Sequence, residues 1–129
     1  MFLKHTHIFV LLLSSAFIIS CREYAVTYTY KMLNKSNQEI KVVFKISKIS
    51  KKDSVFIAKN SEETVYIATG GVGGGNPETD IHLKIFEYLE VYQDSTKSKK
   101  DFSLTSDWNY IKGKKNTHVY SCEVYQSDF

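Results

Sequence analysis

Proline and cysteine are scarce in this sequence, which contains one proline and two cysteines among 129 residues. Two cysteines allow at most one disulfide bond. Glycine is also infrequent, since the chain has six and five of them lie in one short run. With 43% hydrophobic and 24% charged residues, the composition excludes a disordered chain and fits a globular protein. We expect one domain with a single hydrophobic core.

A large excess of charge is absent as well. The formal net charge is +3 at pH 7, and Lys4 is the only charged residue before Cys21, so the rest of the chain carries about two excess positive charges. Such a small excess gives no support to a nucleic-acid partner, because binding to phosphates needs clustered basic residues in larger excess. We therefore expect no binding to nucleic acid.

The N-terminus has the pattern of an export signal. Lys4 forms a basic start, and the apolar run Ile8–Ile19 follows it. That run is about a dozen residues long, which is too short to span a membrane comfortably but typical of the hydrophobic region of a signal peptide. It ends at Ile18-Ile19-Ser20-Cys21, which resembles the lipobox of bacterial lipoproteins: a branched apolar residue, a tolerant position, a small residue and the cysteine.

This resemblance implies how the chain is processed and anchored. Cleavage would fall between Ser20 and Cys21, so that 1–20 is the lipoprotein signal peptide and 21–129 a single domain. Cys21 would carry a diacylglyceryl group on its sulfur and usually an acyl chain on its new amine. Several chains together anchor a protein stably, because each buried methylene contributes about 0.8 kcal/mol. Arg22 stands where enterobacterial lipoproteins of the inner membrane carry Asp, which favours the outer membrane, on its periplasmic or surface face.

The same residues allow two other interpretations. Cys21 can instead pair with Cys122 in an oxidising compartment, or the apolar run can be an uncleaved anchor. If Cys21 is lipidated, Cys122 has no partner within the chain. Because Cys122 belongs to the alternating series Tyr120, Cys122, Val124, we expect its thiol to be buried as a small hydrophobic side chain.

Most of the chain after Cys21 alternates apolar and other residues, which is the two-residue period of a β-strand with one buried face. The first two such segments are Tyr24–Met32 and Ile40–Ile46, separated by the turn formers Asn34–Asn37. We expect these two strands to form a hairpin. The basic stretch Lys48–Asp53 that follows is expected to be a turn.

Further strands and one turn complete the predicted fold. The strands are expected at Val55–Ala58, Thr64–Thr69, Ile81–Tyr92, Trp108–Ile111 and Thr117–Tyr125. Ile81–Tyr92 is ambiguous, because Ile85, Leu89 and Tyr92 also fit a helix, and Gly113 marks a hairpin turn. The fold class is therefore all-β: a small antiparallel β-sandwich of immunoglobulin-like type with about seven or eight strands, or a small barrel.

One low-complexity segment interrupts the strands. Its residues are Gly70, Gly71, Val72, Gly73, Gly74, Gly75 and Asn76. Glycines add no side chains to a core and lose much backbone entropy on ordering, so we expect a flexible loop and the candidate binding loop of the domain. It lacks the Gly-Lys-Ser/Thr ending of a phosphate-binding loop. Asn76, Glu78 and Asp80 alternate as in calcium loops, but turn hydrogen bonds explain Asn76 and Asp80 equally well, so we expect no metal and no cofactor.

No set of residues is suited to catalysis. Beyond residue 20 the histidines are His82 and His118, far apart in the sequence, and no Ser/His/Asp set or carboxylate pair can be nominated. Cys122 and His118 would share one face of a strand about 13 Å apart, which is too far for proton transfer. The sequence therefore predicts a protein that is not an enzyme.

Lysines and tyrosines are the remaining groups with binding potential. The lysines form three groups in expected turns: Lys48, Lys51 and Lys52; Lys97, Lys99 and Lys100; and Lys112, Lys114 and Lys115. We expect solvated surface, with a patch for acidic lipid or glycan if the turns converge at one end of the sandwich. The nine tyrosines are expected in the core and in cross-strand pairs rather than in a carbohydrate-stacking platform.

The chain as a whole resembles the small lipoproteins common in Bacteroidota. The resemblance is carried by a Tyr-rich first strand, an Asn/Ser turn, the glycine-rich loop, the strand Leu89–Tyr92, Trp108 and a last strand ending in Asp128-Phe129. It implies an address and a fold but no activity. We expect a lipid-anchored cell-envelope protein, acting as a non-catalytic module that binds an envelope protein or glycan. The alternative is an inhibitor or immunity-type lipoprotein that blocks an enzyme.

Overall fold

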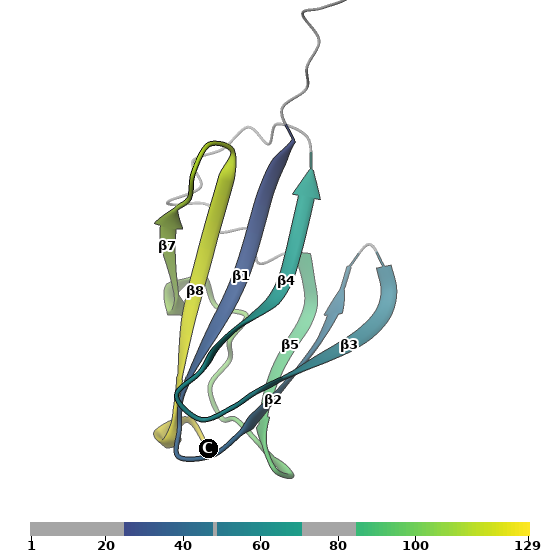
Figure 1. Cartoon of the computed structure of the whole chain (residues 1–129). Helices are drawn as coiled ribbons and strands as arrows, with labels where there is room; N and C mark the ends of the chain where they lie inside the picture. Colours follow the sequence, from purple (N-terminus) through teal and green to yellow (C-terminus); the bar gives the residue numbers. More distant parts are fainter. Residues whose placement is uncertain (1–24, 48, 71–84) are drawn as a thin grey trace, which may run out of the picture.

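The computed structural model describes residues 25–47, 49–70 and 85–129, which form eight β-strands in two sheets (Figure 1). Sheet A contains β1 (Val26–Lys35), β4 (Glu62–Gly70), β7 (Trp108–Lys112) and β8 (Thr117–Tyr125). Sheet B contains β2 (Ile40–Ile46), β3 (Ile49–Ile57), β5 (Phe86–Gln93) and β6 (Thr96–Lys97). Two short 3-10 helices are η2 (Thr105–Asp107) and η3 (Gln126–Asp128). Across these ranges no helix has the length and hydrophobicity to cross a bilayer.

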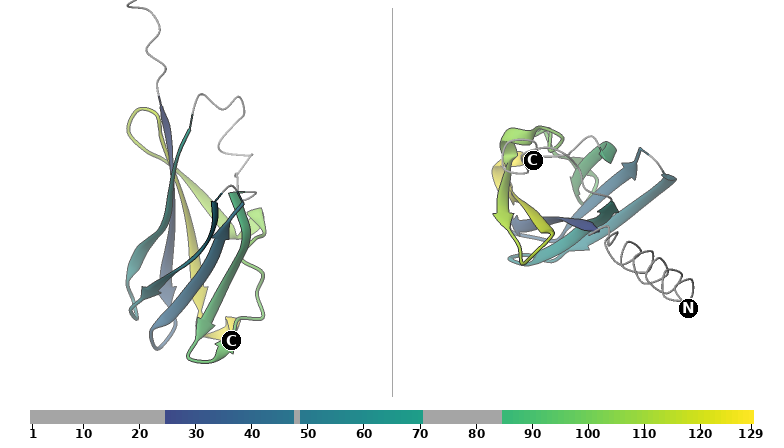
Figure 2. Two further views of the ribbon diagram at one scale, coloured as in Figure 1. Left: turned by 90° about the vertical axis from the view of Figure 1, so that its right-hand side faces the viewer. Right: turned by 90° about the horizontal axis from the view of Figure 1, so that it is seen from above.

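The two sheets pack face to face, as the side view in Figure 2 shows. The strand order is β4-β1-β8-β7 in sheet A and β3-β2-β5-β6 in sheet B. Neighbouring strands are antiparallel except β1 and β8, which run parallel from Thr27 opposite Thr117 to Lys35 opposite Tyr125. The predicted small all-β sandwich is confirmed.

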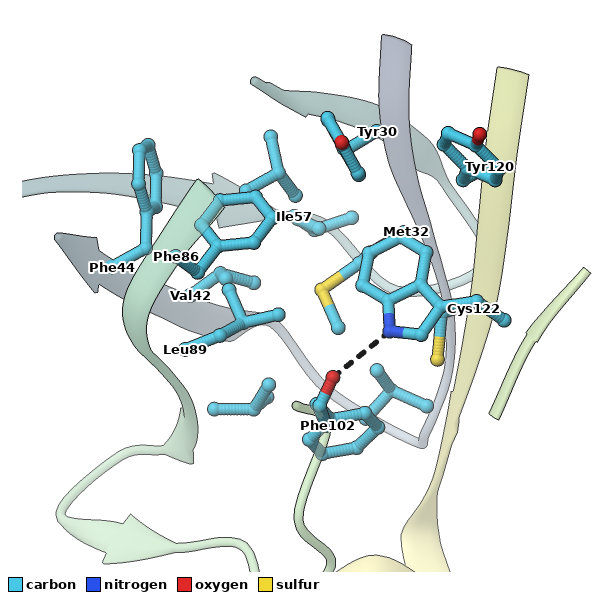
Figure 3. Close-up of a cluster of buried hydrophobic side chains, with 14 of the residues drawn as sticks. Tyr30, Met32, Val42, Phe44, Ile57, Phe86, Leu89, Phe102, Tyr120 and Cys122 are labelled. Atoms are coloured by element: carbon cyan, nitrogen blue, oxygen red, sulfur yellow. Dashed lines mark hydrogen bonds between the residues drawn. The ribbon is translucent and has the colours of Figure 1, made fainter. Parts of the chain in front are cut away.

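The core lies between the sheets and is built by the predicted two-residue period. In β1 the inward residues Tyr30 and Met32 are fully buried, and in β8 the same holds for Tyr120, Cys122 and Val124. Figure 3 shows Tyr30, Met32 and Cys122 facing side chains of sheet B. Its dashed line is the 2.9 Å hydrogen bond from the indole of Trp108 to the carbonyl oxygen of Phe102. The core members from sheet B include Ile40, Val42, Phe44, Ile46, Ile57, Phe86, Leu89 and Val91. The expected use of tyrosine in the core is confirmed for Tyr30 and Tyr120.

The predicted hairpin of the first two strands is wrong, because β1 and β2 belong to different sheets. The turn between them crosses from one sheet to the other around the fully buried Asn34. Its Nδ2 donates to the carbonyl oxygens of Gln38 (2.8 Å) and Ile57 (2.9 Å), and its Oδ1 accepts from the N–H (2.9 Å) and hydroxyl (2.7 Å) of Ser36. These hydrogen bonds satisfy the polar groups that become buried where the chain crosses between the sheets. In an exposed hairpin turn, water would form the same bonds.

Two predicted turns also need correction, and one predicted strand is confirmed where it is described. The basic stretch Lys48–Asp53 is not a turn, since all but its first residue belongs to β3. β3 is an edge strand that pairs with β2 on one side only. Lysines are common on edge strands, because their charge opposes pairing with a further strand on the open side. Part of the expected turn that contains Lys97 forms the short strand β6, because two residues are too few to show alternation in the sequence. The ambiguous segment Ile81–Tyr92 is a strand where it is described, from Phe86 to Gln93.

Candidate functional site

Most of the predicted site residues lie outside the described part of the chain. These are Ser20, Cys21, residues 71–76 of the candidate binding loop, Glu78, Asp80 and His82. Gly70 is described as the last residue of β4. Its φ is not positive, and a Cβ added there would meet no described atom within 4 Å. Neither the backbone nor packing against described residues therefore requires glycine at position 70.

Gly113 differs from Gly70, because its turn requires a glycine. Its N–H donates to the carbonyl oxygen of Thr117 at 3.1 Å, and an added Cβ would lie 2.7 Å from that same oxygen. This approach is closer than a side chain permits. The predicted hairpin turn at Gly113 is confirmed, and it joins β7 to β8.

Three elements meet at one end of sheet A, at the top of Figure 1, which we call the upper end. β1 begins and β4 ends there, with Val26 opposite Gly70. The β7–β8 hairpin lies beside them, since the N–H of Thr27 donates to the carbonyl oxygen of Asn116 at 2.8 Å. The first residue of the candidate binding loop and the hairpin thus share the end at which β1 begins.

A group of aromatic rings lies on the inner face of sheet A near this end. The ring of His118 stacks on Tyr28 with centroids 5.3 Å apart and lies 5.8 Å from the ring of Tyr110. The hydroxyl of Tyr110 and Nδ1 of His118 form a 2.9 Å hydrogen bond. All three side chains are half-buried, whereas Tyr120, which stacks against Tyr28, is fully buried. The Tyr28–Tyr110–His118 cluster therefore presents aromatic surface at the margin of the core, whereas Tyr120 presents none.

The second and third lysine groups lie at opposite ends of the described sandwich, so these two do not form one basic patch; Lys48 of the first group lies outside the described residues. Lys112, Lys114 and Lys115 lie in or beside the hairpin at the upper end. In the strand register, Lys97 of β6 lies opposite Tyr92 of β5, and Tyr92 lies opposite Lys41 near the start of β2. The N–H of Lys99 donates to the carbonyl oxygen of Asp128. The second group is therefore at the opposite, lower end, beside the C-terminus (Figure 2). The order of strands in the sheets decides this separation, which no local pattern reveals.

A shallow hollow of about 360 Å³ lies beside β5, between Glu87–Val91 and Lys97–Asp101. Most of its charged side chains form ion pairs within the protein. Nζ of Lys97 lies 2.7 Å from the carboxylate of Glu90, which also accepts a hydrogen bond from Tyr92. The pKa of Glu90 is lowered, first by the Lys97 hydrogen bond and then by that from Tyr92. Paired and solvated groups of this kind have little free charge to offer a ligand.

Cys122 is unpaired and fully buried, as predicted. Burial raises the pKa of its thiol to about 12, against an ordinary value of 9.0. His118 lies four residues away on the same strand, with Tyr120 between them on the inner face. A thiol held neutral in the core is unsuited to act as a nucleophile.

We expect native Cys122 to resist thiol reagents. A pKa near 12 leaves about a thousandfold less thiolate at neutral pH than a pKa of 9.0 does, and burial blocks access as well. Maleimide labelling followed by mass spectrometry should therefore be slow in native protein and rapid in urea. Rapid labelling of the native protein would contradict the buried position of the thiol.

Neither a cluster of metal ligands among the described residues nor a comparison with known proteins identifies the site. Over the described ranges, no three His, Cys, Asp or Glu side chains are grouped closely enough to hold a metal ion. No family model, curated protein or solved structure matches the chain. The interpretation of the upper end therefore depends on its own geometry and on the sequence.

Proposed function

We propose that this chain is a cell-envelope lipoprotein held to the membrane by acyl chains on Cys21, with a β-sandwich that binds an envelope partner without catalysing a reaction. The observation that carries the anchor is the sequence Ile18-Ile19-Ser20-Cys21 at the end of an apolar run. The fold is compatible with cleavage there, because both four-stranded sheets are built from Val26 onward. Removal of residues 1–20 takes nothing from the described core.

The upper end of the sandwich is the surface that we propose for binding. It contains the half-buried Tyr28–Tyr110–His118 cluster and the start of the glycine run at Gly70, where packing against described residues does not require glycine. Aromatic faces suit stacking on sugars or on protein side chains. Because β1 also begins at this end, an anchor at Cys21 keeps the surface near the membrane. This position favours a partner that is itself held in the envelope, such as a membrane protein or a surface glycan.

Shortening the glycine run tests the binding role. We expect replacement of residues 70–75 by a two-residue turn to leave the melting temperature of the full chain unchanged, because glycines contribute no core side chains. Capture of a stoichiometric partner from solubilised envelope membranes should be lost. Melting temperature and capture are measured on the same preparation.

The outcomes of this experiment separate the possible roles. Full capture by the shortened protein would remove the loop from the binding surface and leave it as a connection. Capture of one enzyme, with loss of that enzyme's activity, would favour the inhibitor or immunity-type alternative. Absence of any partner for the wild-type protein would contradict the binding module.

A further inference from the structure

We propose that the β7–β8 hairpin is a second membrane contact of the anchored domain, in which Lys112, Lys114 and Lys115 bind anionic lipid headgroups. The inference rests on the proposed acylation of Cys21. It goes further than the anchor because it specifies which surface of the sandwich faces the membrane.

The length of chain between Cys21 and the fold limits where the hairpin can be. Val26 is five residues after Cys21, and an extended chain covers at most about 3.6 Å per residue, so β1 begins within roughly 18 Å of the anchored residue. The hairpin lies directly beside that beginning. The N–H of Thr27 donates to the carbonyl oxygen of Asn116, and Thr27 is opposite Thr117 in the parallel β1–β8 pair.

No described carboxylate compensates the charge of the hairpin. Residues 26–30, 66–70 and 108–119, which make up the upper end of sheet A, contain three lysines and no aspartate or glutamate. The three lysines are exposed, and none of them forms an ion pair with any residue that the structure describes. Other lysines of the domain do pair with carboxylates: Lys31, Lys35, Lys45, Lys97 and Lys100. The hairpin therefore concentrates free positive charge at the end nearest the anchor.

Two local features fit a membrane contact better than an ordinary solvated turn. Lys115 has a φ of 45°, in the left-handed region that favours glycine or asparagine, so the turn conformation alone does not select lysine. Ile111, one residue before Lys112, is 53% exposed. Lysines flanked by an exposed apolar side chain are suited to the boundary between headgroups and acyl chains.

The test places a fluorescent label on the hairpin of the acylated protein, produced in cells from the full chain. Asn116→Cys provides the attachment site, since Cys122 is buried and Cys21 is expected to carry lipid. The protein is reconstituted into vesicles of phosphatidylcholine, with or without phosphatidylglycerol, that contain a headgroup quencher. We expect strong quenching only with the anionic lipid, and loss of quenching in 1 M salt, where the Debye length is about 3 Å.

Charge variants separate a specific contact from a general effect of net charge. Each lysine near an anionic surface favours the docked state by about fivefold, so K112Q/K114Q/K115Q should lower the docking equilibrium by roughly 100-fold. The matched control K59Q/K97Q/K99Q removes the same charge from the lower end and should leave quenching unchanged. A label at Ser127→Cys, also at the lower end, should not be quenched.

The possible failures are distinguishable. The mass of the purified protein is measured first, and a chain without acyl groups on Cys21 would overturn the proposed anchor and, with it, the hairpin contact. An acylated chain whose hairpin label is quenched equally in neutral and anionic vesicles would overturn the hairpin contact alone. Equal loss of quenching in the lower-end control would do the same.

Discussion

Replacing Cys21 with alanine is expected to abolish incorporation of labelled fatty acid and to leave precursor that still contains residues 1–20. The thiol is the group to which a diacylglyceryl chain would be attached, and alanine offers no nucleophile in its place. The variant also loses the membrane affinity that the acyl chains would supply, since each acyl methylene contributes about 0.8 kcal/mol when buried. The measurement is metabolic labelling with palmitate, followed by electrophoresis of the full chain.

Cys122→Ala is the matched control for this experiment, because it removes the other cysteine of the chain. Its thiol is fully buried, so its removal should leave labelling at the wild-type level. A wild-type protein that takes up no more label than Cys21→Ala would end the lipoprotein proposal. If labelling were lost in Cys122→Ala and kept in Cys21→Ala, the lipid would be attached to Cys122, which would contradict the proposed anchor at Cys21.

Replacing Asn34 with alanine is expected to destabilise the sandwich by about 3 kcal/mol, because each buried polar group left unpaired costs about 1 to 3 kcal/mol. The substitution removes four hydrogen bonds and orphans the N–H of Ser36 and the carbonyl oxygen of Ile57. For a domain of this size, the loss lowers the melting temperature by about 12 °C or more. Urea unfolding followed by the fluorescence of the buried Trp108 measures the effect.

Asn37→Ala provides the comparison within the same turn. Asn37 is exposed, and its side chain accepts one hydrogen bond of 3.2 Å from Gln93. We expect its loss to cost less than about 1 kcal/mol. Similar stabilities for the two variants would contradict the role of Asn34 in holding the crossing between the sheets.

The features that could be predicted from the sequence are those determined by neighbouring residues. Alternation predicted β1, β2 and β8, because on a strand with one buried face the side chains at every second position enter the core. The same alternation predicts the interior position of Cys122, which the structure confirms. Gly113 was identified as a turn because a tight hairpin needs a residue without a Cβ.

The features that could not be predicted depend on which strands become neighbours. Asn34–Asn37 contains turn-forming residues, yet the pattern does not say whether the next strand pairs with β1 or crosses to the opposite sheet. The parallel pairing of β1 with β8 joins the first and last strands, and no local signal encodes it. The positions of the lysine groups and of the Tyr28–Tyr110–His118 cluster follow from that pairing. These positions could therefore not be predicted from the sequence alone.

The intact mass of the protein, extracted from the membranes of cells that express the full chain, tests the proposed lipid anchor most directly. We expect a chain that begins at Cys21 and carries a diacylglyceryl group, with or without a further acyl chain on its amine. The N-terminal peptide should contain the lipid, and Cys122 should be recovered as a free thiol. A mass that includes residues 1–20, or a peptide in which Cys21 is bridged to Cys122, would contradict the proposed anchor.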